Sequence, residues 1–357
     1  MNRDVLEILE EYKTKVNERL EIFFDQKINE ALLISGHLKD ILVHGKEFTM
    51  RGGKRLRPVF FIFGYKCVGG EDVDAIIDAS LSMELMQSYL LIHDDIYDEG
   101  TLRRGRPTTH IVFKEICDRQ YGGTGSIRFG ENMAILAGDI LESYGEEIIA
   151  RSQFNDKYVA RALRKYTETV QKVNYGQVLD ILSEKKDNIT EEDILMIQKL
   201  KTATYTIEGP LHIGGLLGGA TEKDIKIMSE YGIPLGQAFQ IQDDILGLFG
   251  SEKQLGKSVG SDIKEGKKTL LILKALERCE EDQKDIILNA LGNKNISNKE
   301  VEAVRKVVQD TGSLDYSKKL AQELTDIAIN TIKKSDFTNE GKEFLIKIGE
   351  FIANREY

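Results

Sequence analysis

The stretch SLSMELMQSYLLIHDDIYD, residues 80–98, decides the fold. Its apolar residues recur with the 3.6-residue period of a helix, and the run ends in acidic residues. Most of the chain repeats this period, whereas alternating Val/Ile/Tyr-rich runs joined by hairpin turns are missing. The sequence therefore predicts an all-α protein. Helices are expected over residues 3–32, 54–68, 72–97, 131–150, 157–183, 190–207, 222–247, 268–277, 297–311, 314–333 and 339–353.

Composition narrows the class of protein. The chain has 357 residues, and we expect them to form a single domain, residues 1–357. Only four residues are proline, which favours long helices, and the net charge of −10 argues against a nucleic-acid partner. No run of eighteen apolar residues predicts a membrane span, and there is no secretory signal. The three cysteines, Cys67, Cys117 and Cys279, lack metal-ligand spacing, so we expect free thiols and a cytoplasmic location.

A first acidic cluster ends the helix predicted over 72–97. Asp94 and Asp98 are four residues apart and share a helix face, with Asp95 one position round. Three carboxylates in one turn repel each other, and a cation between them would relieve the repulsion. Carboxylate oxygens suit Mg²⁺, which also keeps waters and substrate phosphates as ligands. Arg103 and Arg104 follow closely, so this segment predicts a site for a metal-bound diphosphate.

A second acidic cluster repeats the pattern in GQAFQIQDDILGLFG, residues 236–250. Asp243 and Asp244 again end an apolar helix, and Gln240 lies one turn earlier on the same side. The basic segment that follows contains Lys257, Asp262, Lys267 and Lys268. Acidic pairs at the ends of two apolar helices predict a central cavity with a charged mouth and an apolar depth.

Two further segments carry basic residues. MRGGKRLRPVFF, residues 50–61, combines Gly52 and Gly53, which allow close backbone approach, with Arg51, Lys54, Arg55 and Arg57. Such a cluster in an acidic protein suits a second diphosphate, bound without metal. In QKLKTATYT, residues 198–206, Lys201 and Thr202 have small neighbours and could donate hydrogen bonds to a leaving oxygen.

Together these segments indicate a reaction between two diphosphate esters with apolar tails. One ester would ionise, with Mg²⁺ acting as Lewis acid and template for the departing diphosphate. Arg103, Lys201 and Lys257 would add preorganised positive charge to the leaving group. The carbocation must be shielded from water, which the apolar helix faces allow. This chemistry needs no nucleophilic Ser, Cys or His.

The sequence resembles the trans-isoprenyl diphosphate synthases of the polyprenyl synthetase family. The matching motifs are GGKRLRP at 52–58, DDIYD at 94–98, RR at 103–104, KT at 201–202, FQIQDD at 239–244, and GK with SDIKEGKKT at 256–269. They occur in the family's order within a core of about residues 45–275. The resemblance implies a helical bundle around a cavity, a homodimer and dependence on two or three Mg²⁺ ions. It also implies head-to-tail condensation of isopentenyl diphosphate with dimethylallyl, geranyl or farnesyl diphosphate.

The resemblance also assigns roles to residues of this chain. It implies contacts to isopentenyl diphosphate from Lys54, Arg57, Gln87 and Arg104. It implies contacts to the allylic diphosphate, and the catalytic groups, among Arg103, Lys201, Thr202, Gln240, Lys257 and Lys267. It implies Mg²⁺ ligands at Asp94, Asp98 and Asp243. The helical wheel supports Gln87 separately, because seven residues before Asp94 is almost two full turns.

The resemblance also bears on product length, and this sequence differs from the family pattern at two places. In the family, residues just upstream of the first acidic motif form the floor of the tail pocket, here Tyr89, Leu90 and Met86. An aromatic residue only at Tyr89, five before Asp94, resembles the archaeal type of geranylgeranyl diphosphate synthase, so a C20 product is expected. The second acidic motif has Gly247 where a third aspartate is usual. The segment 119–132 is expected to form an unusually long loop.

Four alternatives remain open. A farnesyl or longer-chain polyprenyl diphosphate synthase would differ only in product length. A class I terpene cyclase would need an Asn/Asp-Ser/Thr-Glu motif, which DDILGLFGS at 243–251 does not supply. The pair His93–Asp94 suggests an HD-type metal phosphohydrolase, but the only upstream histidines, His37 and His44, lie in a segment that does not indicate a metal site. A non-catalytic partner subunit should have lost motif residues, and this chain retains nearly all.

Overall fold

The computed structural model describes residues 4–186, 188–250 and 260–353. Within these ranges the chain is almost wholly helical, which confirms the all-α prediction. It divides into two compact units, Met1–Tyr166 with Pro210–Ala220, and Thr167–Gly209 with Thr221–Tyr357. Each unit is described by itself below.

The first unit is a set of packed helices with one small hairpin. Its elements are α1 (Val5–Ile34), η1 (Gly36–Leu38), α2 (Lys39–Met50), α3 (Leu56–Cys67), α4 (Val73–Tyr97), β1 (Leu102–Arg103), β2 (Arg106–Pro107), α5 (Thr109–Gln120), α6 (Ser126–Ala150), the first part of α7 (Asp156–Lys185) and most of α9 (Gly209–Leu217). Asp4 and Glu7 form a capping box that starts α1. Leu9, Val16 and Leu20 then form one buried stripe along this helix.

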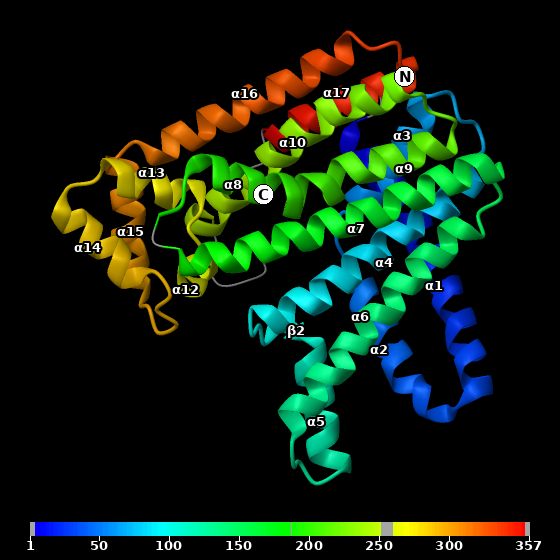
Figure 1. The fold of residues 1–357 in the computed structure, drawn as a ribbon, viewed down its shortest axis with the longest axis horizontal. Helices are drawn as coiled ribbons and strands as arrows, with labels where there is room; N and C mark the ends of the chain where they lie inside the picture. Colours follow the sequence, from blue (N-terminus) through cyan, green and yellow to red (C-terminus); the bar gives the residue numbers. More distant parts are fainter. Residues whose placement is uncertain (1–3, 187, 251–259, 354–357) are drawn as a thin grey trace. The chain divides into compact units, whose positions relative to one another are not determined.

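Helix α4 is the core helix of the first unit and carries the first acidic cluster at its end. The Asp72 side chain caps its start by accepting from the Ala75 amide at 3.0 Å. Among the described residues it alone is long and apolar enough to cross a membrane, but 72% of its most apolar window is buried in the protein. It packs against α3 and α6, and α6 pairs with α5 as a helical hairpin (Figure 1).

The Gly-rich segments differ from the sequence predictions. The predicted loop 119–132 is wrong, because α5 continues to Gln120 and α6 already begins at Ser126. Only a short turn remains, in which Gly122, Gly123 and Gly125 have positive φ. Helix α9 is not predicted from the sequence; Gly214 lets it pack closely on α3, because a β-carbon there would overlap the Phe61 carbonyl. Helices α2, α5, α12 and α14 are not predicted either.

The second unit is built around α10 (Glu222–Phe249). Its other elements are the rest of α7, α8 (Glu191–Ile197), η2 (Gln198–Glu208), α12 (Ser261–Glu265), α13 (Leu270–Arg278), α14 (Glu281–Ala290), α15 (Asn298–Asp310), α16 (Ser313–Lys333) and α17 (Asn339–Ala353). Capping boxes begin α8, α10 and α15. Helix α16 packs against both α10 and α17 (Figure 1).

The predicted helix over 190–207 is helical throughout, but its second half, η2, is a π-helix. The Thr204 hydroxyl donates to the Lys199 carbonyl five residues earlier, at 2.8 Å. Two glycines let neighbouring helices approach the η2 backbone closely. A β-carbon at Gly176 of α7 would lie 2.5 Å from the Lys201 nitrogen, and one at Gly236 of α10 would overlap Ala203. The wide helix that carries Lys201 and Thr202 is thus held between α7 and α10.

Candidate diphosphate sites

The first acidic cluster is joined to the hairpin that follows it. After α4 the chain turns through Glu99 and Arg104, which both have positive φ, and β1 pairs with β2. This turn directs Arg103 back onto the helix end. The Arg103 Nε donates to Asp95 Oδ1 at 2.6 Å, and its Nη2 lies 3.4 Å from Asp94 Oδ2. One guanidinium therefore bridges two of the three aspartates.

Asp94 and Asp95 lie in different environments although they are neighbours in sequence. The Asp95 side chain is 3% exposed and that of Asp94 is 20% exposed. Burial raises the pKa of Asp95 to about 6, and Arg103 opposes this rise. Its buried Oδ2 has no hydrogen-bond partner. Asp94 and Asp98 are both partly exposed and so are the accessible carboxylates of this cluster, whereas the pairing of Asp95 with Arg103 does not follow from the sequence.

The donor set fits Mg²⁺ bound mainly through a substrate. Asp94 and Asp98 offer carboxylate oxygens one helical turn apart, at the partly exposed end of α4. Across the part of the chain that the structure describes, no group of three or more His, Cys, Asp or Glu side chains is arranged to hold a metal ion. The pair Asp94 and Asp98 suits Mg²⁺, because Mg²⁺ binds through one or two carboxylates and completes its shell with phosphate oxygens and waters.

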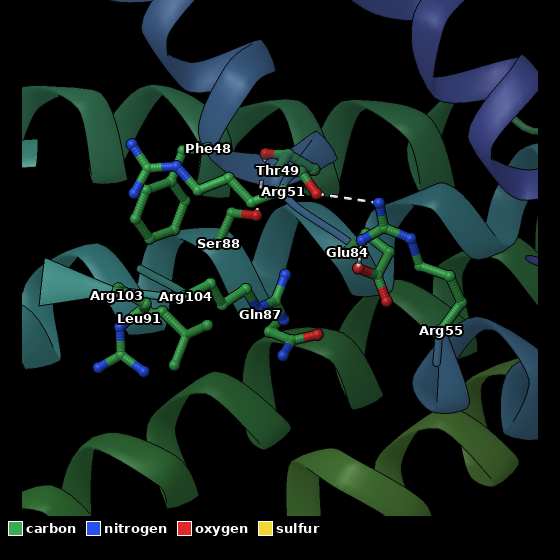
Figure 2. A pocket seen from close by; sticks show the side chains of 10 residues that line it. All are labelled: Phe48, Thr49, Arg51, Arg55, Glu84, Gln87, Ser88, Leu91, Arg103 and Arg104. Carbon is green, nitrogen blue, oxygen red and sulfur yellow. Dashed lines mark hydrogen bonds and ion pairs between the residues drawn. The ribbon is translucent and has the colours of Figure 1, made fainter. Parts of the chain in front are cut away.

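A second site of the first unit is a pocket beside α4 (Figure 2). It brings together Gln87, Arg103 and Arg104 of the predicted site residues. The other lining residues are Phe48, Thr49, Arg51, Arg55, Glu84, Ser88 and Leu91. Lys54 is exposed in the preceding loop, and Arg57 is half-buried in the first turn of α3; neither is among the residues that line this pocket.

Two glycines lie next to Arg104, which lines this pocket. Gly52 and Gly53 have φ values of 102° and 123°, which a residue with a β-carbon adopts only with strain. The Arg104 Nη1 donates to the Gly52 carbonyl, and a β-carbon at Gly53 would lie 3.2 Å from Arg104 Nη2. The two motifs GGK and RR, about fifty residues apart in sequence, therefore meet directly.

The basic cluster at 51–57 divides into two kinds of residue. Arg51 is paired with Glu47, donates to the Pro107 carbonyl at 2.9 Å and stacks on Phe48 at 5.0 Å. Arg55 is 3% exposed and paired with Glu84. The sequence treated all four cations as one phosphate-binding group. The structure instead uses Arg51 and Arg55 in ion pairs that hold the fold.

The second acidic motif forms a hydrogen-bonded chain in the second unit. The Thr202 hydroxyl donates to Gln240 Oε1 at 2.8 Å, and Gln240 Nε2 donates to Asp244 Oδ1 at 2.7 Å. Asp244 is 9% exposed, and burial together with the charge of Asp262 raises its pKa to about 8. Asp243 is partly exposed. As in the first motif, the first aspartate of the pair is accessible and the second is buried.

Two predicted cations of the second unit, Lys201 and Lys267, have carboxylate partners. The Lys201 Nζ lies 2.7 Å from Asp180 Oδ2, a contact that the sequence did not reveal. Lys267 lies 2.8 Å from Glu265 and lines a small pocket with Asp244, Gly247 and Asp262. The predicted contact Lys257 lies outside the described residues.

The predicted chain-length residues lie along the buried part of α4. Met86 is fully buried, Tyr89 is 9% exposed and Leu90 is partly exposed. The Tyr89 ring packs edge-on against His93 with 4.9 Å between centroids. His93 in turn lies 3.0 Å from the Ile135 carbonyl of α6 and closes over Gly138, where a β-carbon would overlap its Nε2.

Comparison with known proteins decides the family. The polyprenyl synthetase family model matches residues 40–309, about three quarters of the chain. The chain belongs to the polyprenyl synthetase family. This membership confirms the resemblance seen in the motifs and makes the protein an enzyme, a trans-prenyltransferase of the isoprenoid synthase fold.

Individual relatives of this polyprenyl synthetase are similar over nearly their whole length. The geranylgeranyl diphosphate synthase of Sulfolobus acidocaldarius is 34% identical and covers 93% of this chain and 99% of its own. The geranylfarnesyl diphosphate synthase of Aeropyrum pernix is 33% identical over 85% of this chain and 91% of its own. The structure of geranylgeranyl pyrophosphate synthase from Corynebacterium glutamicum, complexed with isoprenyl diphosphate and magnesium, has a TM-score of 0.92 at 29% identity, covering 98% of this chain and 99% of that one.

Proposed function

We propose that this polyprenyl synthetase condenses isopentenyl diphosphate head-to-tail with allylic diphosphates and releases geranylgeranyl diphosphate. The observation that carries the proposal is the pairing of Arg103 with Asp94 and Asp95 at the end of α4. Carboxylates suited to Mg²⁺ and a guanidinium cation suited to a diphosphate lie together at this helix end. In the reaction the allylic C–O bond breaks, the isopentenyl double bond forms the new C–C bond, and a proton leaves the adjacent carbon.

In the first unit, each group has a proposed task. Asp94 and Asp98 would hold Mg²⁺, and Arg103, which lies on Asp94 and Asp95, would supply positive charge to the metal-bound diphosphate. Bound Mg²⁺ would supply Lewis-acid stabilisation of the departing diphosphate. Gln87 and Arg104 bind the diphosphate of isopentenyl diphosphate without metal, together with Lys54 and Arg57.

In the second unit, Asp243 is the proposed ligand of a further Mg²⁺ ion. Thr202 and Gln240 lie in one hydrogen-bonded chain that ends on Asp244, which supports a role in orienting the departing oxygen. Lys201 stabilises negative charge on that oxygen and is held by Asp180 until then. Lys257 and Lys267 are proposed contacts of the same diphosphate.

The proposed C20 product rests on the floor of the tail pocket. Tyr89 is the one aromatic residue among the positions assigned to that floor, and its ring is fixed against His93. The names of the relatives include both geranylgeranyl and geranylfarnesyl diphosphate synthases, so a C25 product is the alternative. We further propose a homodimer in the cytoplasm, as the family resemblance implies.

The test is product analysis with the purified protein. It is incubated with isopentenyl diphosphate, Mg²⁺ and one allylic primer at a time, and the dephosphorylated products are sized by chromatography. A C20 alcohol as the longest main product is expected. A C15 or C25 product would refute the assigned length. Consumption of allylic diphosphate alone would indicate a cyclase, and no consumption at all would indicate a non-catalytic subunit.

A further inference from the structure

Arg55 adopts a backbone conformation that needs support. It immediately precedes α3 with φ 53° and ψ 37°, in the left-handed region, and it is 3% exposed. A non-glycine residue is strained there, because its β-carbon crowds the carbonyl oxygen that follows. Such conformations persist where surrounding contacts fix them, and they occur at functional sites. The contacts that fix Arg55 therefore also set the shape of the Gly52–Lys54 loop.

Three helices contribute those contacts. The Arg55 Nε donates to Asn17 of α1 at 2.9 Å, and Nη2 donates to the Thr49 carbonyl of α2 at 3.0 Å. Nη1 donates to Glu84 Oε2 of α4. One buried guanidinium thus ties the glycine loop to the helix that carries Gln87. This accounts for the buried arginine without any contact to substrate.

Glu84 is the other half of this pair, and its environment is unusual. The residue is 3% exposed, and its second oxygen, Oε1, has no hydrogen-bond partner. It lines the pocket with Gln87 and Arg104 (Figure 2). A carboxylate repels a diphosphate, so Glu84 is a poor direct ligand. Its charge instead balances the crowded guanidiniums: burial and neighbouring arginines lower the pKa of Arg104, and Glu84 opposes that effect.

We propose that Glu84 and Arg55 are positioning residues that hold the Gly52–Lys54 loop and Arg104 in the shape that binds a metal-free diphosphate. This inference rests on the proposed function, which assigns the pocket to isopentenyl diphosphate. Arg104 contacts Gly52 and comes close to Gly53, so a loop that lost its anchor at Arg55 would also lose the seat of Arg104. The pair acts on one substrate only.

The test compares Glu84→Gln, Glu84→Asp and Arg55→Lys with the wild type. Binding of inorganic diphosphate without Mg²⁺ is measured by titration calorimetry, and the KM values for both substrates are measured separately. Removal of one charged hydrogen-bond partner predicts about tenfold weaker diphosphate binding and an equal rise in the KM for isopentenyl diphosphate. The KM for the allylic substrate and kcat should stay within twofold. Glu84→Asp, which keeps the charge, should recover part of the loss.

The matched control is Glu147→Gln, which removes one of the two carboxylate partners of the buried Lys27 in the same unit. It should lower the melting temperature without changing either KM. If the Glu84 and Arg55 variants behave like this control, or lose kcat without a change in KM, the positioning role is refuted. If the wild type forms no prenyl product but binds diphosphate in a Glu84-dependent way, the proposed function fails and the positioning role stands.

Discussion

The carboxylate of Asp262 lies where a side chain at Gly247 would be, since a β-carbon at position 247 would lie 2.9 Å from Asp262 Oδ2. The backbone supports this arrangement, because the Gly260 amide donates to the Gly247 carbonyl at 3.1 Å. Asp262 also raises the pKa of the neighbouring Asp244. The second acidic motif lacks its third aspartate, but a carboxylate from α12 is already present at that place.

Restoring the missing aspartate should therefore harm the protein. Gly247→Asp would put a third carboxylate beside Asp244 and Asp262, so we expect a lower melting temperature without Mg²⁺. Gly247→Ala is the control: a small shift of Asp262 makes room, and the better helix propensity is worth up to about 1 kcal/mol. Thermal unfolding of both variants measures the difference. A Gly247→Asp protein at least as stable as Gly247→Ala would contradict the repulsion.

Shortening Tyr89 should lengthen the product. Tyr89→Ser removes the ring that packs on His93 and opens space along the buried side of α4. We expect products of C25 and longer, measured by chromatography after dephosphorylation. Tyr89→Phe keeps the ring and should keep the wild-type distribution. Unchanged products from Tyr89→Ser would remove this residue from the floor of the tail pocket.

Gly138 offers access to the same ring from α6. A β-carbon there would overlap His93 Nε2, so Gly138→Ala must displace the imidazole that Tyr89 packs against. The expected result is a broader product distribution with a loss of stability of about 1–3 kcal/mol from overpacking. Chemical denaturation and product sizing test the two effects. A sharp C20 product from Gly138→Ala would show that His93 does not position Tyr89.

Glu142 of α6 should make stability depend on pH. Burial, followed by the charges of Glu146 and Asp139, raises the pKa of Glu142 to about 7 from 4.5. The folded state then binds more protons than the unfolded state between these pH values, so stability falls as pH rises from about 4.5 to 7. Glu142→Gln should stabilise the protein at pH 8, on the order of 1 kcal/mol because partial exposure screens the charge, and have little effect at pH 4.5.

The measurement for Glu142 is the urea midpoint of wild type and variant at both pH values. Glu115→Gln, on the exposed side of α5, is the control and should show no such pH-dependent difference. An equal effect of Glu142→Gln at both pH values would exclude titration of this carboxyl as the cause.

Removing metal should abolish catalysis but leave the fold intact. The described residues include no group of three or more side chains arranged to hold a metal ion. The helices α4 and α10, which carry the acidic motifs, are held in the fold by their buried apolar side chains. We expect EDTA to abolish product formation and Mg²⁺ to restore it. The substrate-free melting temperature should change by less than about 2 °C, because two carboxylates bind Mg²⁺ weakly until a diphosphate completes its ligand shell. Unfolding on chelation would disagree with this view of the site.

The sequence predicts those features that depend on local pattern. Helix α4 and its terminal aspartates follow from apolar period and spacing, and membership of the family follows from the ordered motifs. The sequence does not predict that Lys54 is exposed while the adjacent Arg55 is buried. Arg55 is buried because its backbone turns into the left-handed region and because Glu84, 29 residues later, accepts its hydrogen bond. Neither fact leaves a local trace.

Packing also overrides local preference at α9 and η2. Gly214 looks like a turn residue in its Gly-rich surroundings, but it lies inside α9 and lets this helix pack against the Phe61 backbone of α3, despite the low helix propensity of glycine. The period of residues 198–208 fits an ordinary helix, so the sequence gives no sign of the five-residue hydrogen-bond step that the structure shows. The ion pair between Lys201 and Asp180 cannot be predicted from local spacing either, because the two residues are 21 positions apart and lie on different helices.

The extra residue in each turn of the π-helix η2 affects how this segment tolerates the loss of a residue. A π-turn holds one more residue than an α-turn, so losing a single residue within η2 would let the coil tighten to an α-helix while the flanking helices keep their places. The side chains inside η2 would be redistributed around the helix, and the pairings of Lys201 with Asp180 and of Thr202 with Gln240 would be lost. A one-codon deletion in this segment would thus leave a well-folded protein that has lost the alignment of its polar groups.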